Sequence, residues 1–130
     1  MPTLAEAHAE LFPRGPAPAE YDRWLLRLWI EGVGVWIPNP PAHGAALRLH
    51  DLHHVLTGYG LDWIGEAELG AFELAAGCGP HVGALPFDLA ALGTGLALAP
   101  RRTLRAFARG RRARSLYARA FDPSVLERDL

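Results

Sequence analysis

Side chains that commonly bind metal ions are concentrated in one short stretch, LHDLHHVLTG, and just beyond it. On an α-helix, which turns by about 100° per residue, His54 lies about 40° from His50 and Asp51 about 100° from it. These three side chains therefore share one arc of a predicted helix. A glycine-containing break follows, and the first turn of the next predicted helix can return a further carboxylate to that arc. The four candidate ligands are His50, Asp51, His54 and Glu66.

Imidazoles combined with carboxylates suit a divalent metal ion of intermediate hardness. We expect zinc first, with iron(II) or manganese(II) as alternatives. A pair of histidines at i and i+4 is often explained by packing or by a surface position alone. Burying such a pair beside Asp51 without a metal would be costly, and this favours a metal site. Two imidazoles and two carboxylates also leave room on the metal for water or a substrate.

Two further side chains could support the ligands without binding the metal. Glu73 follows Glu66 by seven residues and lies on the same helical face, so it could orient a ligand. His53 lies about 60° outside the ligand arc, so it is a second candidate for this role or a surface group. No catalytic residue is predicted beyond these two candidates. The remaining histidines, interpreted as ordinary loop or surface groups, are His8, His43 and His81.

Helical periodicity predominates along the chain, which predicts an all-α fold. The 130 residues are enough for a single domain, a compact bundle of about five to six helices. The metal motif would lie on 45–77, where Asp62 can cap a helix that ends at Gly77. The prolines between residues 36 and 44 predict an extended loop. The predicted helices cover about 3–12, 18–31, 45–57, 62–77, 87–98 and 101–119.

The basic residues are all arginines, and their distribution is uneven. Residues 101–119 hold 8 Arg and no acid, whereas residues 1–100 hold 4 Arg and 11 acids. A solvated helix normally mixes acids with its arginines, so this segment is predicted to attract an anionic membrane or a carboxylate ligand. Few aromatic residues interleave with the arginines, so nucleic acid is not expected. If the segment is helical, one stripe of it presents the arginines that would attract the anion, and the alternative is that the acidic body of the same chain pairs with them. The stripe consists of Arg101, Arg105, Arg109 and Arg112.

Cysteine usage favours a reducing compartment. The single cysteine, Cys78, excludes an internal disulfide and fits the cytoplasm. The N-terminal segment has an early acid and no apolar run, so no signal peptide is predicted. Residues 82–100 are apolar over nearly the length of a membrane span, but Asp88, Pro86 and several glycines favour a buried helix pair. We expect a cytoplasmic protein, with peripheral contact at the inner face of the membrane as a further expectation.

The ligand spacing resembles that of the coenzyme Q biosynthesis protein 4 family, which carries H-D-x-x-H, eleven residues and then E. Residues 50–54 match the first part, and Glu66 follows after Val55 through Gly65. The segments LTGYGLDWIGEAELGAFELA and RAFARGRRARSLYARAF are similar to those that follow the motif and precede the C-terminus in the family. The resemblance covers residues 45–120 and is to the compact bacterial branch. The first 44 residues do not resemble the longer N-terminal half of the eukaryotic members.

This resemblance implies an all-helical, often dimeric protein with a metal site and an apolar cavity for an isoprenoid-type chain. It links the chain to ubiquinone biosynthesis, in which the C1 carboxylate of the ring precursor is replaced by a hydroxyl. The implied enzyme is a metal-dependent oxidative decarboxylase, or lyase, of a quinone-type precursor, with a hydrophobic or prenylated small molecule as its partner.

Aromatic residues flanking the ligand arc independently predict an apolar cavity that opens beside the metal, although they could equally fill the core. A long-chain quinone or a fatty acid is the kind of ligand that such a cavity would bind. The residues predicted to line it are Trp24, Leu28, Trp29, Leu47, Trp63 and the stretch 83–99.

Two other functions stay open on the sequence. The metal could be structural, in a non-catalytic lipid-binding or scaffold module, and open coordination positions would distinguish an enzyme from such a module. The dyad His50-Asp51 also resembles that of HD-type phosphohydrolases. That family needs an upstream histidine and a distant aspartate, for which only His43 and Asp88 are available. This is the least favoured interpretation.

Overall fold

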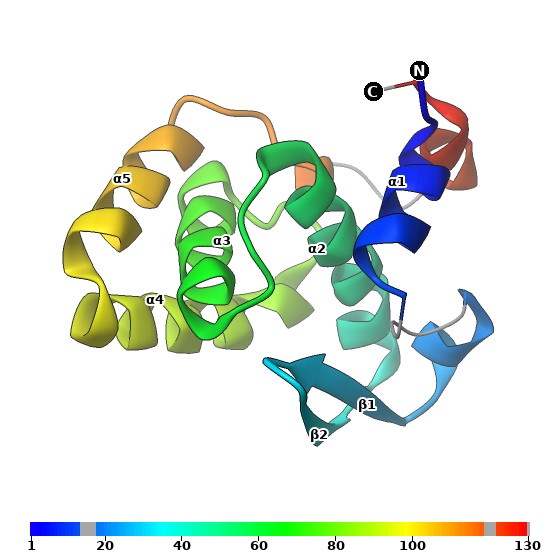
Figure 1. Cartoon of the computed structure of the whole chain (residues 1–130), viewed down its shortest axis with the longest axis horizontal. Helices are drawn as coiled ribbons and strands as arrows, with labels where there is room; N and C mark the ends of the chain where they lie inside the picture. The colour runs from blue at the N-terminus through cyan, green and yellow to red at the C-terminus, as the bar shows by residue number, and fades with distance from the viewer. Residues whose placement is uncertain (14–17, 119–121, 130) are drawn as a thin grey trace.

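The structure, a computed structural model, describes residues 1–13, 18–118 and 122–129. Within these ranges it is mostly helical, with five α-helices and one antiparallel hairpin (Figure 1). The elements are α1 (Leu4–Leu11), β1 (Leu25–Ile30), β2 (Val33–Pro38), α2 (Pro41–Thr57), α3 (Trp63–Ala76), α4 (Leu85–Leu98) and α5 (Pro100–Gly110). Short 3₁₀ turns lie at Pro18–Asp22, Val82–Ala84, Leu116–Ala118 and Pro123–Glu127. The prediction of a purely all-α fold is therefore wrong, although helices do predominate.

The hairpin replaces the helix that was predicted at 18–31. Its strands pair so that Leu28 lies opposite Val35, and side chains of alternating residues point to the same face. Glu31 and Gly32 between them have φ values of 50° and 79°, which is the geometry of a tight two-residue hairpin turn. The apolar residues of 18–31 fit a period of two as well as a helical period, and pairing with β2 decides in favour of the strand.

α2 begins at Pro41, four residues before the predicted helix and inside the stretch 36–44 that was predicted as a loop. Proline is tolerated in the first turn of a helix because the N–H that it lacks has no partner there. Gly58 ends the helix with φ at 78°, a left-handed conformation that glycine adopts without strain. The ligand segment therefore occupies the C-terminal half of a long helix.

α3 packs against both α4 and α5 (Figure 1). Small residues make this contact close: a Cβ on Gly70 would lie 2.4 Å from that of Ala91, and one on Gly110 would lie 2.2 Å from the carbonyl oxygen of Phe72. α5 ends at Gly110, well before the predicted end at residue 119, which lies outside the described ranges. The chain then returns to α2, where Tyr117 is buried.

The prediction that residues 82–100 belong to a buried helix pair is only partly correct. The face of α4 toward α3 is buried, but Leu89 is 52% exposed and Leu98 is 61% exposed. Small residues at the contact with α3 bring the helices together and leave the larger apolar side chains on the outside. None of the helices in the described ranges reaches the length and apolarity that a membrane-crossing segment requires.

Candidate metal centre

The end of α2 and the start of α3 bring two imidazoles and one carboxylate together. Nε2 of His50 lies 3.0 Å from Oε2 of Glu66, and Nε2 of His54 lies 3.2 Å from Oε1 of the same residue. The ligand atoms of the three residues all lie within 4.8 Å of one another. Asp62 caps α3 by accepting from the backbone N–H of Gly65, which fixes the first turn that carries Glu66.

The proton of His50 is assigned by its second contact. Nδ1 of His50 lies 2.8 Å from Oε2 of Glu73, whose side chain is fully buried. Burial alone would raise the pKa of Glu73, but His50 and His53 outweigh it and hold that pKa far below its ordinary value. Because an ionised carboxylate only accepts hydrogen bonds, Nδ1 of His50 donates. The lone pair of the neutral ring is therefore on Nε2, which faces Glu66.

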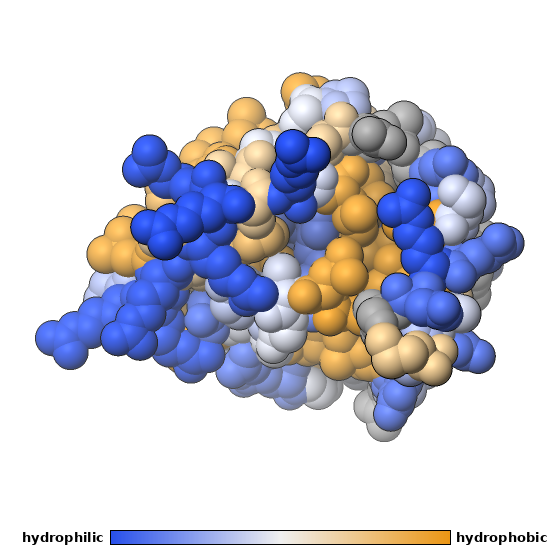
Figure 2. Space-filling model, turned by 90° about the horizontal axis from the view of Figure 1, so that it is seen from above, coloured by the Kyte–Doolittle hydropathy of each residue, from blue (hydrophilic) through white to orange (hydrophobic). Residues whose placement is uncertain are grey.

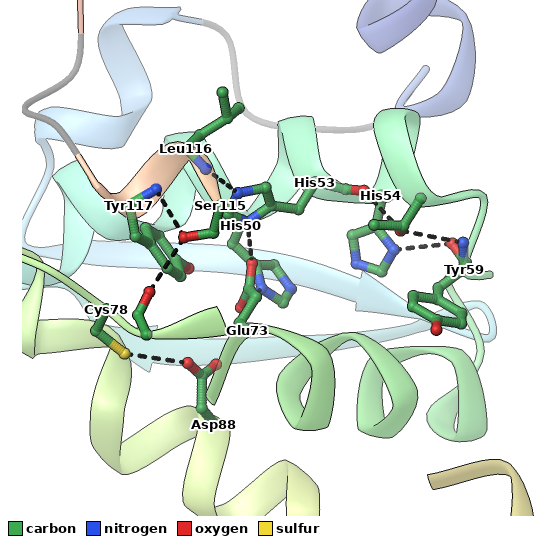
Figure 3. Close-up of polar contacts among 12 residues, drawn as sticks. His50, His53, His54, Tyr59, Glu73, Cys78, Asp88, Ser115, Leu116 and Tyr117 are labelled. Atoms are coloured by element: carbon green, nitrogen blue, oxygen red, sulfur yellow. Dashed lines mark hydrogen bonds and ion pairs between the residues drawn. The ribbon is translucent and has the colours of Figure 1, made fainter. Parts of the chain in front are cut away.

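His54 has the same arrangement with a different acceptor. Its Nδ1 lies 3.0 Å from the backbone carbonyl oxygen of Tyr59, so Nδ1 carries the proton (Figure 3). Its Nε2 is buried and has no hydrogen-bond partner among the described residues, although it lies 3.2 Å from Glu66. A buried polar atom without a partner is costly and calls for an explanation. Here the atom is a lone-pair donor directed at the other two ligand atoms.

Three electron-pair donors that face one another repel unless a cation lies between them. A proton is one solution, and it explains the pKa values of this cluster. Burial would lower the pKa of His50, but Glu73 and Glu66 outweigh it and raise that pKa well above 6.5. Burial would raise the pKa of Glu66, but contact with His50 and His54 lowers it to about 2. A divalent metal ion is the other solution, and it would also satisfy His54.

The structure leaves the fourth predicted ligand, Asp51, outside this group. The hydroxyl of Tyr21 donates a hydrogen bond to Oδ2 of Asp51, and Nε2 of His8 lies 3.7 Å from the same oxygen. Asp51 is about 100° around the helix from His50, so its side chain reaches the 3₁₀ turn at 18–22 instead of α3. His8 is correspondingly part of a polar cluster rather than an ordinary surface group.

Of the two residues predicted to support the ligands, Glu73 contacts His50 directly, and His53 contacts Glu73. Oε1 of Glu73 accepts from Nδ1 of His53, so Glu73 lies between His53 and His50 (Figure 3). Nε2 of His53 in turn accepts from the backbone N–H of Leu116 at 2.8 Å. His53 is buried, which excludes the surface alternative. The acceptor on Nδ1 of a metal-binding histidine fixes its tautomer and orientation, and Glu73 is placed to do this for His50.

Asp88 is a buried carboxyl that the sequence-based prediction did not include in the site. It is 3% exposed on α4, and its oxygen lies within 4.8 Å of ligand atoms of His50 and Glu73. Burial first, and then the charge of Glu73, raise its pKa to about 9. A usable signal was present, because Asp88 is the lone charged residue in the apolar stretch 82–100.

Two cavities reach the candidate centre, and His50 and Glu66 line both of them. The first, of about 320 Å³, lies between the hairpin, α2, α3 and α4, and its lining is mostly apolar. The second, of about 300 Å³, lies beside β1 and the end of α1 and includes Asp51 in its lining. The site is therefore accessible from two sides.

The predicted lining of the apolar cavity is confirmed for Leu28, Leu47 and Trp63. Trp29 lines the second cavity instead, and Trp24 is 70% exposed. These two tryptophans were assigned to a helix, but Trp29 lies on β1 and Trp24 immediately precedes this strand. His43, also predicted as an ordinary loop residue, is buried and lines the first cavity.

Cys78 should react slowly with alkylating reagents. Burial first, and then the nearby carboxyl of Asp88, raise the pKa of its thiol to about 11. Because the thiolate is the reactive form, the rate of iodoacetamide labelling should be low at neutral pH and should keep rising up to a pH of about 11. Mass spectrometry measures the rate, with urea-unfolded protein as the control. A rate that levels off near the ordinary thiol value of 9.0 would contradict this assignment.

Comparisons with protein-family models, with curated proteins and with solved structures give no match for this chain. The resemblance to the coenzyme Q biosynthesis protein 4 family therefore rests on the spacing of the ligand motif and its neighbouring segments. Function has to be argued from the geometry of the site.

Proposed function

We propose that the protein binds one divalent metal ion through Nε2 of His50, Nε2 of His54 and the carboxylate of Glu66. The observation that carries this proposal is the buried Nε2 of His54, which lacks a hydrogen-bond partner among the described residues. Each Nδ1 has its own acceptor, so the neutral form of each ring would present the lone pair of its Nε2 to the same point. This is the arrangement that metal-binding histidines generally have.

Catalytic zinc sites typically have three protein ligands, whereas structural zinc sites usually have four. Two imidazoles with one carboxylate suit zinc and also iron(II), with manganese(II) as a further alternative. A divalent ion held there would act as a Lewis acid toward a carboxylate, carbonyl or phenolate oxygen. The open positions would accept that oxygen, and this favours metal-dependent chemistry over a purely structural role.

The substrate class that we propose is a lipophilic small molecule with a polar head group. The first cavity would hold the apolar part of the molecule and exclude water from it. His50 and Glu66 line this cavity, so a metal bound to them would lie beside the head group. A prenylated aromatic acid fits this description, and decarboxylation with hydroxylation is the activity that the family resemblance suggests. The competing proposal is a non-catalytic lipid-binding module with a structural metal.

An HD-type phosphohydrolase is less well supported. In that class the histidine and aspartate of the dyad belong to one metal site, whereas Asp51 here is hydrogen-bonded to Tyr21 and does not join His50. His43, the upstream histidine available for such a site, is hydrogen-bonded to Asn39 and stacks on Phe87.

Elemental analysis of the purified protein should find one divalent ion per chain. Glu66→Gln removes the charged ligand and should lower the affinity for zinc by at least about tenfold. The matched control is Glu68→Gln on the same helix, because the carboxylate of Glu68 pairs with Arg102 and not with a histidine. Equal metal content and affinity in the wild type and Glu66→Gln would exclude the proposed centre.

We also propose that α5 contacts an anionic membrane surface. Arg102 pairs with Glu68, and Arg109 donates to the carbonyl of Thr57, so part of the arginine segment is used within the protein. Arg101, Arg105 and Arg112 are exposed, and no carboxylate in the described part of the chain lies within ion-pair distance of them. Figure 2 shows strongly hydrophilic side chains gathered at the end of the molecule where α5 lies. The exposed apolar residues of α4 lie on the neighbouring helix.

Binding to vesicles should rise with the fraction of anionic lipid and fall as salt is added. Each arginine near such a surface contributes about 1 kcal/mol, so replacing Arg101, Arg105 and Arg112 by glutamine should lower partitioning by about a hundredfold. Co-sedimentation measures this, with neutral vesicles as the control. Equal and negligible binding to both vesicle types would contradict membrane contact. A homodimer that covers α4 is the competing explanation, and analytical ultracentrifugation would detect it.

A further inference from the structure

Tyr21 holds the carboxylate that the sequence places among the metal ligands. Its hydroxyl donates to Oδ2 of Asp51, and both residues are buried, each at 5% exposure. Burial first, and then the charge of Asp51, raise the pKa of the phenol, so the hydroxyl remains a donor near neutral pH. The carboxylate of Asp51 therefore has a strong partner within the protein and does not join His50 and His54.

The rest of the fold fixes Tyr21 in this position. The side-chain amide of Asn39 donates to the carbonyl of Tyr21 at 2.8 Å, and the guanidinium of Arg48 lies 5.1 Å from the centre of its ring. A Cβ on Gly44 would lie 2.3 Å from that carbonyl oxygen, so α2 packs closely against the turn. With its backbone held in this way, the hydroxyl cannot follow Asp51 if that carboxylate turns toward the metal.

Asp51 nevertheless has space in which to turn. His50, Asp51 and Glu66 line the same cavity of about 300 Å³, so open space lies beside all three. A carboxylate that swung into this space would add a fourth protein ligand. Four protein ligands close a zinc site, whereas three leave a position for water or a substrate.

We propose that Tyr21 is a positioning residue that withholds Asp51 from the metal and so keeps one coordination position open. This inference rests on the proposed function, because it requires a metal ion at His50, His54 and Glu66. Turning Asp51 toward the metal would break its hydrogen bond with Tyr21 and leave that hydroxyl only the longer contact, at 3.4 Å, with Nε2 of His8, and this cost favours the open site. A carboxylate, carbonyl or phenolate oxygen of a ligand is the kind of group that the open position accepts.

The test is a double-mutant cycle with the metal alone as the probe. Zinc affinity is measured by competition with a chromophoric chelator, and the absorption spectrum of the cobalt(II) form reports the number of protein ligands. Tyr21→Phe should release Asp51 and raise the affinity by about tenfold, because the hydrogen bond that opposes its turning toward the metal is lost. Adding Asp51→Asn should abolish both this gain and the change in the cobalt spectrum. The matched control is Tyr59→Phe, because Tyr59 contacts His54 through its backbone carbonyl.

Asp51→Asn alone keeps an acceptor for Tyr21 and tests the inference even if Tyr21→Phe folds poorly. It should leave the zinc affinity close to that of the wild type. A loss as large as that in Glu66→Gln would mean that Asp51 is already a ligand, and this would overturn the inference. So would an unchanged affinity in a folded Tyr21→Phe, or a gain that persists in the double variant. If the wild type binds no metal, the proposed function fails as well, so the two failures are distinguishable.

Discussion

Glu73→Gln should both destabilise the fold and weaken metal binding. Glu73 is fully buried and accepts from Nδ1 of His50 and from Nδ1 of His53. Glutamine offers a single oxygen, so its NH₂ group would face one of these N–H donors. Breaking a buried charge-assisted pair by changing one partner costs about 3 to 5 kcal/mol, and losing the acceptor of a metal-binding histidine lowers metal affinity about 10- to 100-fold. Urea unfolding without metal and a zinc titration of the folded variant measure the two effects.

Glu68→Gln is the control for the stability effect. Glu68 lies on the same helix and is also buried, but its partner Arg102 is half-exposed, and a glutamine oxygen can still accept from Arg102, so we expect a smaller loss of stability than in Glu73→Gln. The contrast therefore separates the loss of the histidine contacts from the loss of one buried charge on α3. A destabilised Glu73→Gln variant with unchanged zinc affinity would show that Glu73 supports the fold alone and does not orient His50.

Local chemistry could predict the end of α2 and both ends of α3. Asp62 caps α3 and Gly77 follows its end, as predicted, whereas the cap of α1 by Thr3 was not predicted. The hairpin was missed because its apolar residues fit a helical stripe as well as strand alternation. The Glu31–Gly32 turn is the feature that distinguishes a hairpin from a helix here. Such a turn predicts a hairpin only if the segment after it can form the partner strand.

The candidate site could likewise be predicted only in part. His50, His54 and Glu66 could be predicted because helical geometry alone places the two histidines on one arc and the next helix returns a carboxylate. The position of Asp51 could not, because it depends on Tyr21, which lies thirty residues away in the sequence. Asp88 also depends on tertiary packing, since the close contacts between α3 and α4, such as that of Gly70 with Ala91, bring it near Glu73. Local periodicity predicts ligands on one helix, and contacts between distant segments decide which of them converge.

The stability of the metal-free protein should be greatest in mildly acidic solution. The pKa of His50 is raised in the fold, so its contribution is fully present below the ordinary value of 6.5 and is lost as the pH rises through the folded value. The pKa values of Glu66 and Glu73 are lowered, so their contributions are present above the ordinary value of 4.5 and are lost as the pH falls below it. The two windows overlap between pH values of about 4.5 and 6.5.

Zinc should shift this maximum toward higher pH. A metal ion replaces the proton on Nε2 of His50, so binding competes with protonation and strengthens as the pH rises. Above neutral pH the cluster of His50, His54 and Glu66 loses its proton, and bound zinc would supply the missing positive charge. Melting temperatures measured with excess zinc and with a chelator should diverge steadily from mildly acidic to mildly basic pH. His54→Ala removes one ligand and should make the two curves coincide. A zinc-dependent difference that stays constant or shrinks with rising pH would mean that the metal binds elsewhere on the protein.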